Sequence, residues 1–250
     1  MSHHIVEAIN LHFQYADGTK GLNGVSFKIT HGESVALVGE NGAGKSTLLL
    51  HMNGCLFPTD GEMRVGEYPI TLNNLNIMRR TVGMVFQNAD DQLFMPTVFD
   101  DVAFGPLNLG LEKVEISKIV AASLEKVSMQ HLSARPPYNL SQGEKRAVAI
   151  ATVLAMSPDI LVMDEPTSNL DPVSRTRLIN LLKGFNHTKI IATHDLDMAL
   201  DLCERTIVLH EGKITADGPT KKLFYDEALL NKSNLEKPLR FQHCPVCNKI

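Results

Sequence analysis

The chain has 250 residues and is 44% hydrophobic, which is enough for one large domain or for one domain with an inserted piece. Its net charge of −4 and pI near 6.2 argue against a nucleic-acid-binding protein, because such proteins usually show a basic balance. The sequence shows no signal peptide and no apolar stretch of transmembrane length, so we expect a cytoplasmic protein.

The first part of the chain predicts strands that lead into a glycine-rich loop. Residues 4–38 are rich in strand-like segments, and the last of these, at 34–38, is almost entirely apolar. Residues 39–47 then read Gly-Glu-Asn-Gly-Ala-Gly-Lys-Ser-Thr, and a helix-like run follows at 48–53. A strand, this loop and a helix in succession form the context in which G-x-x-x-x-G-K-[ST] indicates a P-loop.

The residue types in this loop explain how it would bind phosphate. Glycines let the backbone approach the ligand, so that successive N–H groups at a helix N-terminus face the anion. Lys45 would reach the β- and γ-phosphates, and the Ser46 hydroxyl would ligate Mg²⁺. We therefore predict that the chain binds a nucleoside triphosphate. The predicted contacts in the loop are Gly39, Glu40, Asn41, Gly42, Ala43, Gly44, Lys45, Ser46 and Thr47.

The middle of the chain changes from strand-like to helical patterns. Strand-like and turn segments continue through residues 61–86, and Gln87 follows them directly. From residue 88 to about 156 the pattern is mainly helical, for example over 114–128. We interpret 88–156 as a helical piece inserted into an α/β core.

Short motifs follow in the second half of the chain. Residues 140–144 read Leu-Ser-Gln-Gly-Glu and precede a helix-like run. An apolar strand then ends in two adjacent carboxylates, Asp164 and Glu165, and residues 168–171 read Ser-Asn-Leu-Asp. A last apolar strand ends at His194.

In this order the motifs resemble those of the ATP-binding cassette (ABC) ATPases, and the resemblance covers most of the chain. The glycine-rich loop matches Walker A, Gln87 the Q-loop and 140–144 the signature motif. The two carboxylates end Walker B, 168–171 match the D-loop, and His194 matches the switch histidine. One such motif could occur by chance, whereas six in the order of the family could not.

The resemblance implies an α/β fold of the P-loop NTPase type. It consists of a RecA-like core with an antiparallel β subdomain and an inserted α-helical subdomain. The predicted boundaries are 1–230 for the ATPase domain, about 1–87 and 157–222 for its core, about 88–156 for the helical subdomain, and 231–250 for a C-terminal tail.

The resemblance also assigns roles to the polar residues after the strands. Asp164 ends a strand where open α/β sheets bind ligands, and it would hold Mg²⁺ through water together with Ser46 and Gln87. Glu165, pointing the other way, would act as general base or polarise the attacking water. His194 would contact the γ-phosphate and orient that water, although a lone histidine is often only a core or surface residue.

Tyr15 stands where the family places an aromatic residue that stacks on adenine. An aromatic face offers such a base a stacking platform. The alternative is that Tyr15, together with Phe13, is a strand residue that faces the core.

The signature motif implies a dimer. Ser141 and Gly143 would cap the γ-phosphate held by the P-loop of another subunit, at a helix N-terminus. Because the chain carries one P-loop and one signature motif, hydrolysis would require a second copy or a paralogous ATPase subunit, arranged head to tail. The residues predicted to act across this contact are Ser141, Gln142, Gly143, Glu144 and Asp171.

Three residues depart from the usual motifs of the family. Gln142 replaces a glycine and Glu144 a glutamine of the signature motif, while Ser141 and Gly143 are intact. Asn169 replaces a glycine in the D-loop, and we expect the turn to persist because asparagine tolerates positive φ.

The sequence also bears on what the ATPase drives. The chain lacks the long coiled coils of chromosome-associated members and the second cassette of translation-associated ones, which leaves the ATPase subunit of a membrane transporter. Residues 87–94 and 101–111 resemble the energy-coupling factor (ECF) ATPases, especially those of cobalt and nickel importers, although Ala89 stands where proline is common. Two alternatives stay open: an ECF importer of a vitamin or other micronutrient, and an ATP-switched binding module.

This resemblance implies Mg²⁺-dependent ATP hydrolysis at the cytoplasmic face of the cell membrane, by a peripheral protein. Its partners would be integral membrane transporter subunits and no nucleic acid. An exposed apolar patch is expected where a membrane subunit docks, unless the same side chains form the core of the helical subdomain. The candidates are Leu93, Phe94, Met95, Phe99 and Phe104.

The C-terminal tail carries a second candidate metal site. His243, Cys244 and Cys247 have metal-ligand spacing, but structural zinc normally takes four protein ligands. The alternative is a disordered end whose thiols are incidental. Since every predicted site residue lies upstream, we expect truncation before Pro238 to leave hydrolysis nearly unchanged.

Overall fold

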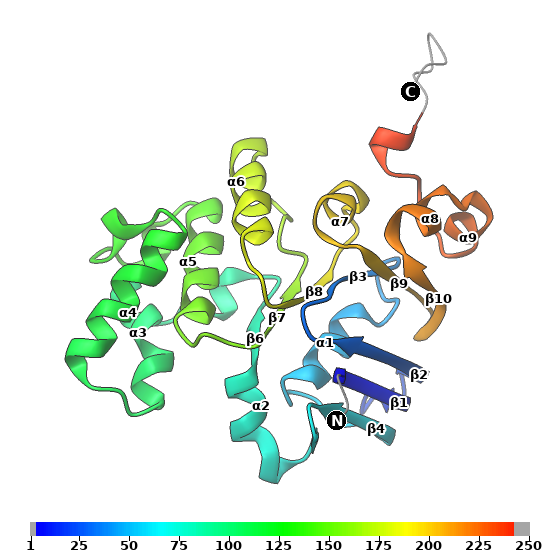
Figure 1. Ribbon diagram of the computed structural model, residues 1–250, viewed down its shortest axis with the longest axis horizontal. Coiled ribbons are helices and arrows are strands. Elements are labelled where there is room, and N and C mark those ends of the chain that lie inside the picture. Colours follow the sequence, from blue (N-terminus) through cyan, green and yellow to red (C-terminus); the bar gives the residue numbers. More distant parts are fainter. Residues whose placement is uncertain (1–3, 243–250) are drawn as a thin grey trace. The chain divides into compact units, whose positions relative to one another are not determined.

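The computed structural model describes residues 4–242, which fold as two compact units (Figure 1). The first unit combines Met1–Arg79 with His187–Ile250, and the second is Arg80–Asn186. None of the helices in the described part of the chain has the length and hydrophobicity needed to cross a membrane.

The first unit contains an antiparallel sheet with the strand order β2-β1-β4-β5. Buried side chains alternate with outward ones along the second half of β2, where Val25, Phe27 and Ile29 face inward. This period of two is typical of a strand with one buried face. The strands are β1 (His4–Gln14), β2 (Lys20–Thr30), β4 (Asp60–Val65) and β5 (Tyr68–Pro69).

Parallel strands form the other sheet region of the first unit. The strand β3 (Ser34–Val38) pairs in parallel with β8 (Thr188–Ala192) and with β9 (Arg205–His210), while β10 (Lys213–Pro219) pairs antiparallel with β9. The apolar residues of β3 are fully buried, as expected for a strand covered on both faces. Since β3 and β8 run in the same direction, the segments that follow them begin at the same edge.

The helices of the first unit include two that were not predicted. Residues 61–86 were expected to contain only strands and turns, but η1 and α2 lie within them. Only Met78 of α2 is buried, so the short helix has no apolar periodicity that would reveal it. The helical segments are α1 (Lys45–Met52), η1 (Leu72–Asn74), α2 (Leu75–Thr81, which crosses the unit boundary), α7 (Leu196–Leu202), α8 (Thr220–Tyr225), α9 (Glu227–Lys232) and η5 (Leu239–Phe241).

The second unit joins two parallel strands to a helical cluster in which α3, α4 and α5 pack on one another. The unit extends beyond the helical segment 88–156 because it also includes its strands and α6. Strands alternating with helices confirm the predicted α/β class. The elements are β6 (Val82–Val85), η2 (Ala89–Asp91), α3 (Val98–Asn108), α4 (Lys113–Lys126), η3 (Gln130–Leu132), η4 (Pro137–Asn139), α5 (Gln142–Leu154), β7 (Ile160–Asp164) and α6 (Pro172–Lys183).

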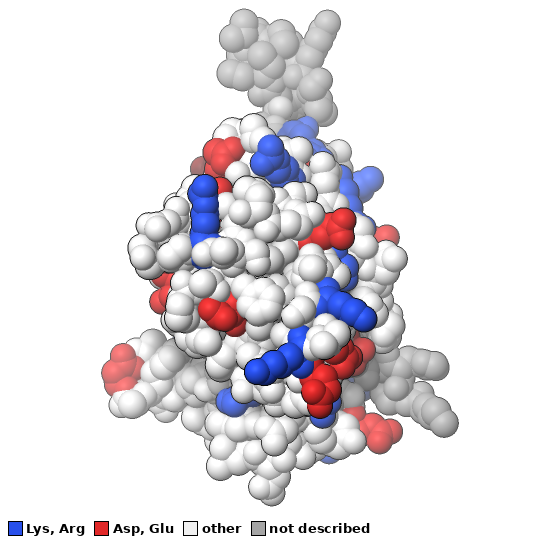
Figure 2. Space-filling model, turned by 90° about the vertical axis from the view of Figure 1, so that its left-hand side faces the viewer, with Lys and Arg blue, Asp and Glu red and all other residues white. Residues whose placement is uncertain are grey.

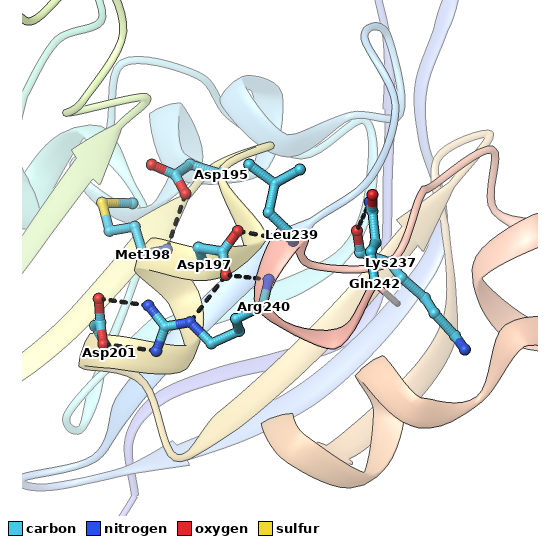
Figure 3. A network of polar contacts seen from close by, with 8 residues as sticks. All are labelled: Asp195, Asp197, Met198, Asp201, Lys237, Leu239, Arg240 and Gln242. Carbon is cyan, nitrogen blue, oxygen red and sulfur yellow. Dashed lines mark hydrogen bonds and ion pairs between the residues drawn. The ribbon is translucent and has the colours of Figure 1, made fainter. Parts of the chain in front are cut away.

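Residues 237–242, called the C-terminal strap below, lie against α7 (Figure 3). The Arg240 guanidinium donates to both carboxylate oxygens of Asp201, at 3.0 and 3.1 Å, and to Asp197 at 2.9 Å. The backbone N–H of Leu239 also donates to Asp197, at 2.9 Å. The predicted tail therefore begins inside α9 and is bonded to the first unit over its described part.

Candidate nucleotide-binding and catalytic site

The loop after β3 has the backbone of a phosphate cradle. Gly44, which precedes α1, has φ 102°, and a Cβ on it would lie 2.5 Å from the carbonyl oxygen of Gly21, so no side chain fits there. Lys45 is buried, and its Nζ donates to the carbonyl oxygens of Gly39 at 2.8 Å and Glu40 at 3.0 Å. The ammonium group is thus held at the loop, where an anion at the N-terminus of α1 would meet it.

A contact that the sequence did not predict holds Glu40 of this loop. Its carboxylate lies 3.1 Å from Nδ1 of His210 and accepts a hydrogen bond of 2.8 Å from Asn234. Asn234, which lies in the predicted C-terminal tail, therefore contacts the P-loop, and truncation before Pro238 would leave this contact in place. His210 also contacts the loop, although it lies 170 residues beyond Glu40 in the sequence.

Tyr15 lies beside the P-loop with its side chain at the surface. Its hydroxyl is 2.7 Å from Oγ1 of Thr47, and 39% of the residue is exposed. Its ring makes an edge-to-face contact with Phe13, whose ring in turn contacts buried His51. The alternative that Tyr15 faces the core is not what the structure shows, and an exposed ring beside the loop fits the adenine platform.

His194 follows β8 at the edge where β3 ends, and β8 is registered with β3 so that Ala192 lies opposite Leu37. Its side chain is exposed, so it is not a core histidine. The next residue, Asp195, caps α7 by accepting a hydrogen bond of 2.9 Å from the N–H of Met198. The first unit therefore presents the P-loop and His194 from neighbouring strands.

The two carboxylates of the second unit lie where β7 ends. Asp164 is the last residue of the strand, and both Asp164 and Glu165 are buried. Glu165 has φ 46°, in the left-handed region that a residue with a side chain rarely adopts. Such strain occurs most often at functional sites, where the surrounding structure enforces it.

Gln87 follows β6, the parallel neighbour of β7. Val85 lies opposite Met163 in the register, so Gln87 and Asp164 come from the same edge of this pair. Gln87 is exposed, while its carbonyl oxygen accepts a hydrogen bond from Arg146 of α5. Within the second unit, the amide of Gln87 and the carboxylates of Asp164 and Glu165 thus follow neighbouring parallel strands.

The signature motif begins α5 with a capping box. Oγ of Ser141 accepts a hydrogen bond of 3.4 Å from the N–H of Glu144, and the Glu144 carboxylate accepts 2.8 Å hydrogen bonds from both N–H and Oγ–H of Ser141. The hydrogen bond from the Ser141 backbone is the main cause that lowers the pKa of Glu144. A Cβ on Gly143 would lie 2.7 Å from Oγ of Ser174, so this glycine allows close packing against α6.

The D-loop lies next to the signature motif within the second unit. Asp171 caps α6 by accepting hydrogen bonds from the N–H groups of Val173 and Ser174, and Ser174 also donates its hydroxyl. The side-chain hydrogen bond from Ser174 is the main cause that lowers the pKa of Asp171. Asn169 has φ 61°, which confirms the expectation that asparagine preserves the turn.

A hollow of about 740 Å³ adjoins both motifs. Ser141 and Gly143 line it from α5, and Ser174 lines it from α6. Lys126 of α4 and Arg177 of α6 add positive charge to its wall. A phosphate group approaching Ser141 would therefore meet a helix N-terminus in a partly cationic setting.

The predicted Mg²⁺ ligands suit that ion chemically. Ser46 supplies a hydroxyl, Gln87 an amide oxygen and Asp164 a carboxylate, and Mg²⁺ prefers such hard oxygen donors together with water and substrate phosphate. The described residues contain no cluster of three His, Cys, Asp or Glu side chains that could hold a metal ion. His243, Cys244 and Cys247 lie outside the described residues.

An apolar patch lies a few residues beyond Gln87. It consists of Phe94, which is 63% exposed, Phe104, whose ring contacts that of Phe94 edge-to-face at 5.1 Å, and Leu107. Buried Asp101 holds the loop by accepting 3.0 Å hydrogen bonds from the N–H groups of Phe94 and Met95, and burial raises the pKa of this carboxyl group. Asp101 thereby holds the loop that carries Phe94 against α3, the helix that carries Phe104 and Leu107.

The other predicted members of this patch are less exposed. Leu93 is buried, and Met95 and Phe99 are half-buried, so the expected surface is only partly present. Figure 2 shows the side of the second unit that lies on the left of Figure 1, where charged side chains of both signs are scattered among uncharged residues. The described residues that face this view form no extended basic patch.

Comparison with known proteins agrees with this set of motifs. Residues 22–168 match the family model described as ABC transporter. The chain belongs to the ABC transporter ATPases. It is 62% identical to a proposed ABC transporter ATP-binding protein of Geobacter sulfurreducens, with the alignment covering 100% of both chains. The fold class predicted from the motifs, an α/β P-loop NTPase of the ABC type, is confirmed.

Other relatives carry more specific names. The energy-coupling factor transporter ATP-binding protein EcfA of Methanocaldococcus jannaschii is 47% identical over 98% of this ABC ATPase and 90% of its own length. The structure of cbiO1 of Clostridium perfringens, described as part of the ABC transporter complex cbiONQ, is 38% identical, with a TM-score of 0.81 over 93% of this chain and 95% of its own. The dimeric cassette MJ0796 is 28% identical, with a TM-score of 0.78 over 86% of this chain and 98% of its own.

Proposed function

We propose that this ABC ATPase hydrolyses ATP as a head-to-tail dimer and energises an ECF-type importer, with cobalt or nickel as its cargo. The observation that carries the importer assignment is the exposed patch of Phe94, Phe104 and Leu107, a few residues beyond Gln87. The relatives named as EcfA and as a component of cbiONQ support the same assignment. The metal cargo rests on the resemblance of residues 87–94 and 101–111 to cobalt and nickel ECF ATPases.

In this proposal the first unit binds the nucleotide. Tyr15 stacks on the base, the P-loop backbone surrounds the phosphates, and Lys45 neutralises charge on the β- and γ-phosphates. His194 contacts the γ-phosphate. Mg²⁺, held by Ser46, Gln87 and Asp164, would neutralise phosphate charge when bound.

Hydrolysis needs a positioned water and a proton acceptor. Glu165 takes that role because its carboxylate is buried beside Asp164 and its strained backbone fixes its direction. Ser141 and Gly143 of the second copy, at the N-terminus of α5, cap the γ-phosphate. Asp171 lies beside them and belongs to the same contact.

Replacing Glu165 by Gln tests the hydrolytic half of the proposal. Glutamine keeps the shape but does not accept a proton, so we expect ATP affinity within about twofold and turnover at least about 100-fold lower. The variant should accumulate as an ATP-bound dimer in sedimentation with Mg-ATP. Normal turnover would exclude Glu165 as the proton acceptor. A variant that stays monomeric at saturating ATP would contradict the contact of Ser141 and Gly143 with the nucleotide of a second copy.

The partner and the cargo need a separate experiment. The chain is purified from its native membrane, and the integral subunits and metals that accompany it are identified. Integral subunits with cobalt or nickel import in vesicles would support the full proposal. Uptake of a vitamin would correct the cargo, and association with a soluble partner alone would favour an ATP-switched module.

A matched pair of variants tests the patch itself. Phe94→Asp places a charge on the patch, so we expect it to reduce co-purification of the membrane subunits by at least about tenfold, a loss typical of an interface hot spot. Val114→Asp changes an equally exposed apolar residue at the start of α4 and should have no effect. Equal behaviour of the two variants would exclude the patch as the docking surface.

A further inference from the structure

Three side chains join α5 to the segment that follows β6, all inside the second unit. Lys145 donates to the Asp90 carboxylate at 2.6 Å. Gln92 accepts from the N–H of Phe86 at 3.2 Å and donates to the carbonyl oxygen of Ala149 at 2.8 Å. The third contact is made by Arg146, and it reaches the backbone of Gln87 itself.

Arg146 is the most buried of these connections. Only 6% of the residue is exposed, and its guanidinium donates through Nη1 to the carbonyl oxygen of Phe86 at 2.6 Å and through Nη2 to that of Gln87 at 2.5 Å. Burial lowers the pKa of this guanidinium, while the negative charge of Asp164 acts in the opposite direction. Arg146 therefore interacts both with the Q-loop backbone and with the carboxylate that ends β7.

These contacts connect α5 directly to the backbone of Gln87. Arg146 lies just over one turn beyond Ser141, the cap of α5, so the helix that starts with the signature motif also holds the carbonyl oxygen of Gln87. A planar guanidinium with two N–H groups can hold two successive carbonyl oxygens in a fixed direction, which a lysine ammonium does less well. The side chain of Gln87 starts from this fixed backbone.

We propose that Arg146 is a positioning residue: it fixes the Q-loop backbone and thereby the starting point of the Gln87 side chain, a ligand of Mg²⁺ in the proposed function. The inference rests on the proposed ATPase function and adds a residue outside the family motifs assigned above.

The test compares Arg146→Ala, Arg146→Lys and the exposed control Lys118→Ala on α4 in the full-length protein. ATP hydrolysis is measured against free Mg²⁺ at saturating ATP, and binding of a fluorescent ATP analogue is measured without Mg²⁺. For Arg146→Ala we expect kcat to fall about 10- to 100-fold, as for a misplaced catalytic group, and the Mg²⁺ concentration for half-maximal rate to rise at least about fivefold. Analogue binding should change less than about twofold, since the P-loop belongs to the other unit.

Arg146→Lys separates positioning from simple loss of stability. It retains the charge and most of the length, so it should fold even if the alanine variant does not, and its Mg²⁺ requirement should lie between those of wild type and Arg146→Ala. Lys118→Ala should match wild type. A lower kcat with an unchanged Mg²⁺ requirement in both Arg146 variants would overturn the inference, because lost folded protein alone lowers the rate without shifting that curve.

The outcomes also separate this inference from the proposed function. A wild-type protein that hydrolyses no ATP, alone or with its membrane partners, would remove the proposed function. If the wild type is active and the Arg146 variants need the same Mg²⁺ concentration for half-maximal hydrolysis as the wild type, only the role of Arg146 is excluded.

Discussion

The P-loop of the first unit and the signature motif of the second are both helix N-termini for which we propose phosphate binding, but their hydrogen bonding differs. In the P-loop, Lys45 is buried and held by two carbonyl oxygens of its own loop, and Gly44 supplies a backbone that no other residue could adopt. In the signature motif, the Ser141 hydroxyl is bonded to Glu144 of the same turn. The first site is arranged to bind a nucleotide by itself, whereas the second is closed by its own capping box until a ligand replaces that bond.

This difference separates binding from hydrolysis. In the proposed mechanism, a single copy should bind ATP through the P-loop, and the signature motif should contribute only when another copy brings its nucleotide. Changes in the P-loop should therefore abolish both properties, and changes in the signature motif should abolish hydrolysis alone.

Lys45→Ala should have the largest effect. Both the charge and the direct phosphate contact are lost, so we expect no detectable ATP binding or hydrolysis. Calorimetric titration with ATP measures binding, and a thermal melt confirms that the variant is folded. Hydrolysis near the wild-type rate would exclude Lys45 as the phosphate clamp.

Ser141→Arg should abolish hydrolysis while ATP binding by the monomer stays within about twofold, since the P-loop is untouched. The large cation would occupy the space that the γ-phosphate of the partner needs. Ser141→Ala is the matched control: it loses the helix cap, which costs about 1 kcal/mol of stability, but leaves that space open and should retain part of the activity. A loss of binding as large as in Lys45→Ala would place Ser141 in the nucleotide site of its own chain.

The smallest effect is expected at the C-terminal strap, where Arg240 contrasts with Arg146. The Arg240 side chain is 47% exposed and bonds to carboxylates, so water can replace its contacts when it is removed. For Arg240→Ala we expect a loss of up to about 1 kcal/mol, a Tm lower by about 2–4 °C, and ATPase activity within about twofold.

Salt provides the check on this interpretation, because screening weakens exposed ion pairs. The difference in Tm between Arg240→Ala and wild type should shrink in 1 M NaCl, whereas Arg64→Ala, which removes an isolated surface pair with Glu62, should change Tm little in either buffer. A difference in Tm that grows with salt would contradict a contribution from the Arg240 ion pairs. A loss of ATPase activity at full stability would show that the strap also affects the site, through α7 and the neighbouring His194.

Several features of the site were predictable because they are local in sequence. Residues 39–47 form a strand–loop–helix unit whose glycine positions and lysine are needed within one short segment, so a motif describes them completely. The positions of Asp164 and His194 after apolar strands follow from the same kind of pattern. The capping box could also have been predicted, since serine followed three residues later by glutamate is its usual signal.

Other features depend on partners far away along the chain. Asn234 meets Glu40 across 194 residues, Arg146 meets Gln87 across 59, and Arg240 meets Asp197 across 43. No spacing rule connects such residues, because a side chain chooses its partner only after strands and helices have packed. The sequence alone therefore determined which phosphate chemistry the chain performs, through short motifs whose backbone geometry is set by neighbouring residues. Only the tertiary structure decided which side chains hold those motifs in place, because burial and distance between remote elements exist only once the chain has folded.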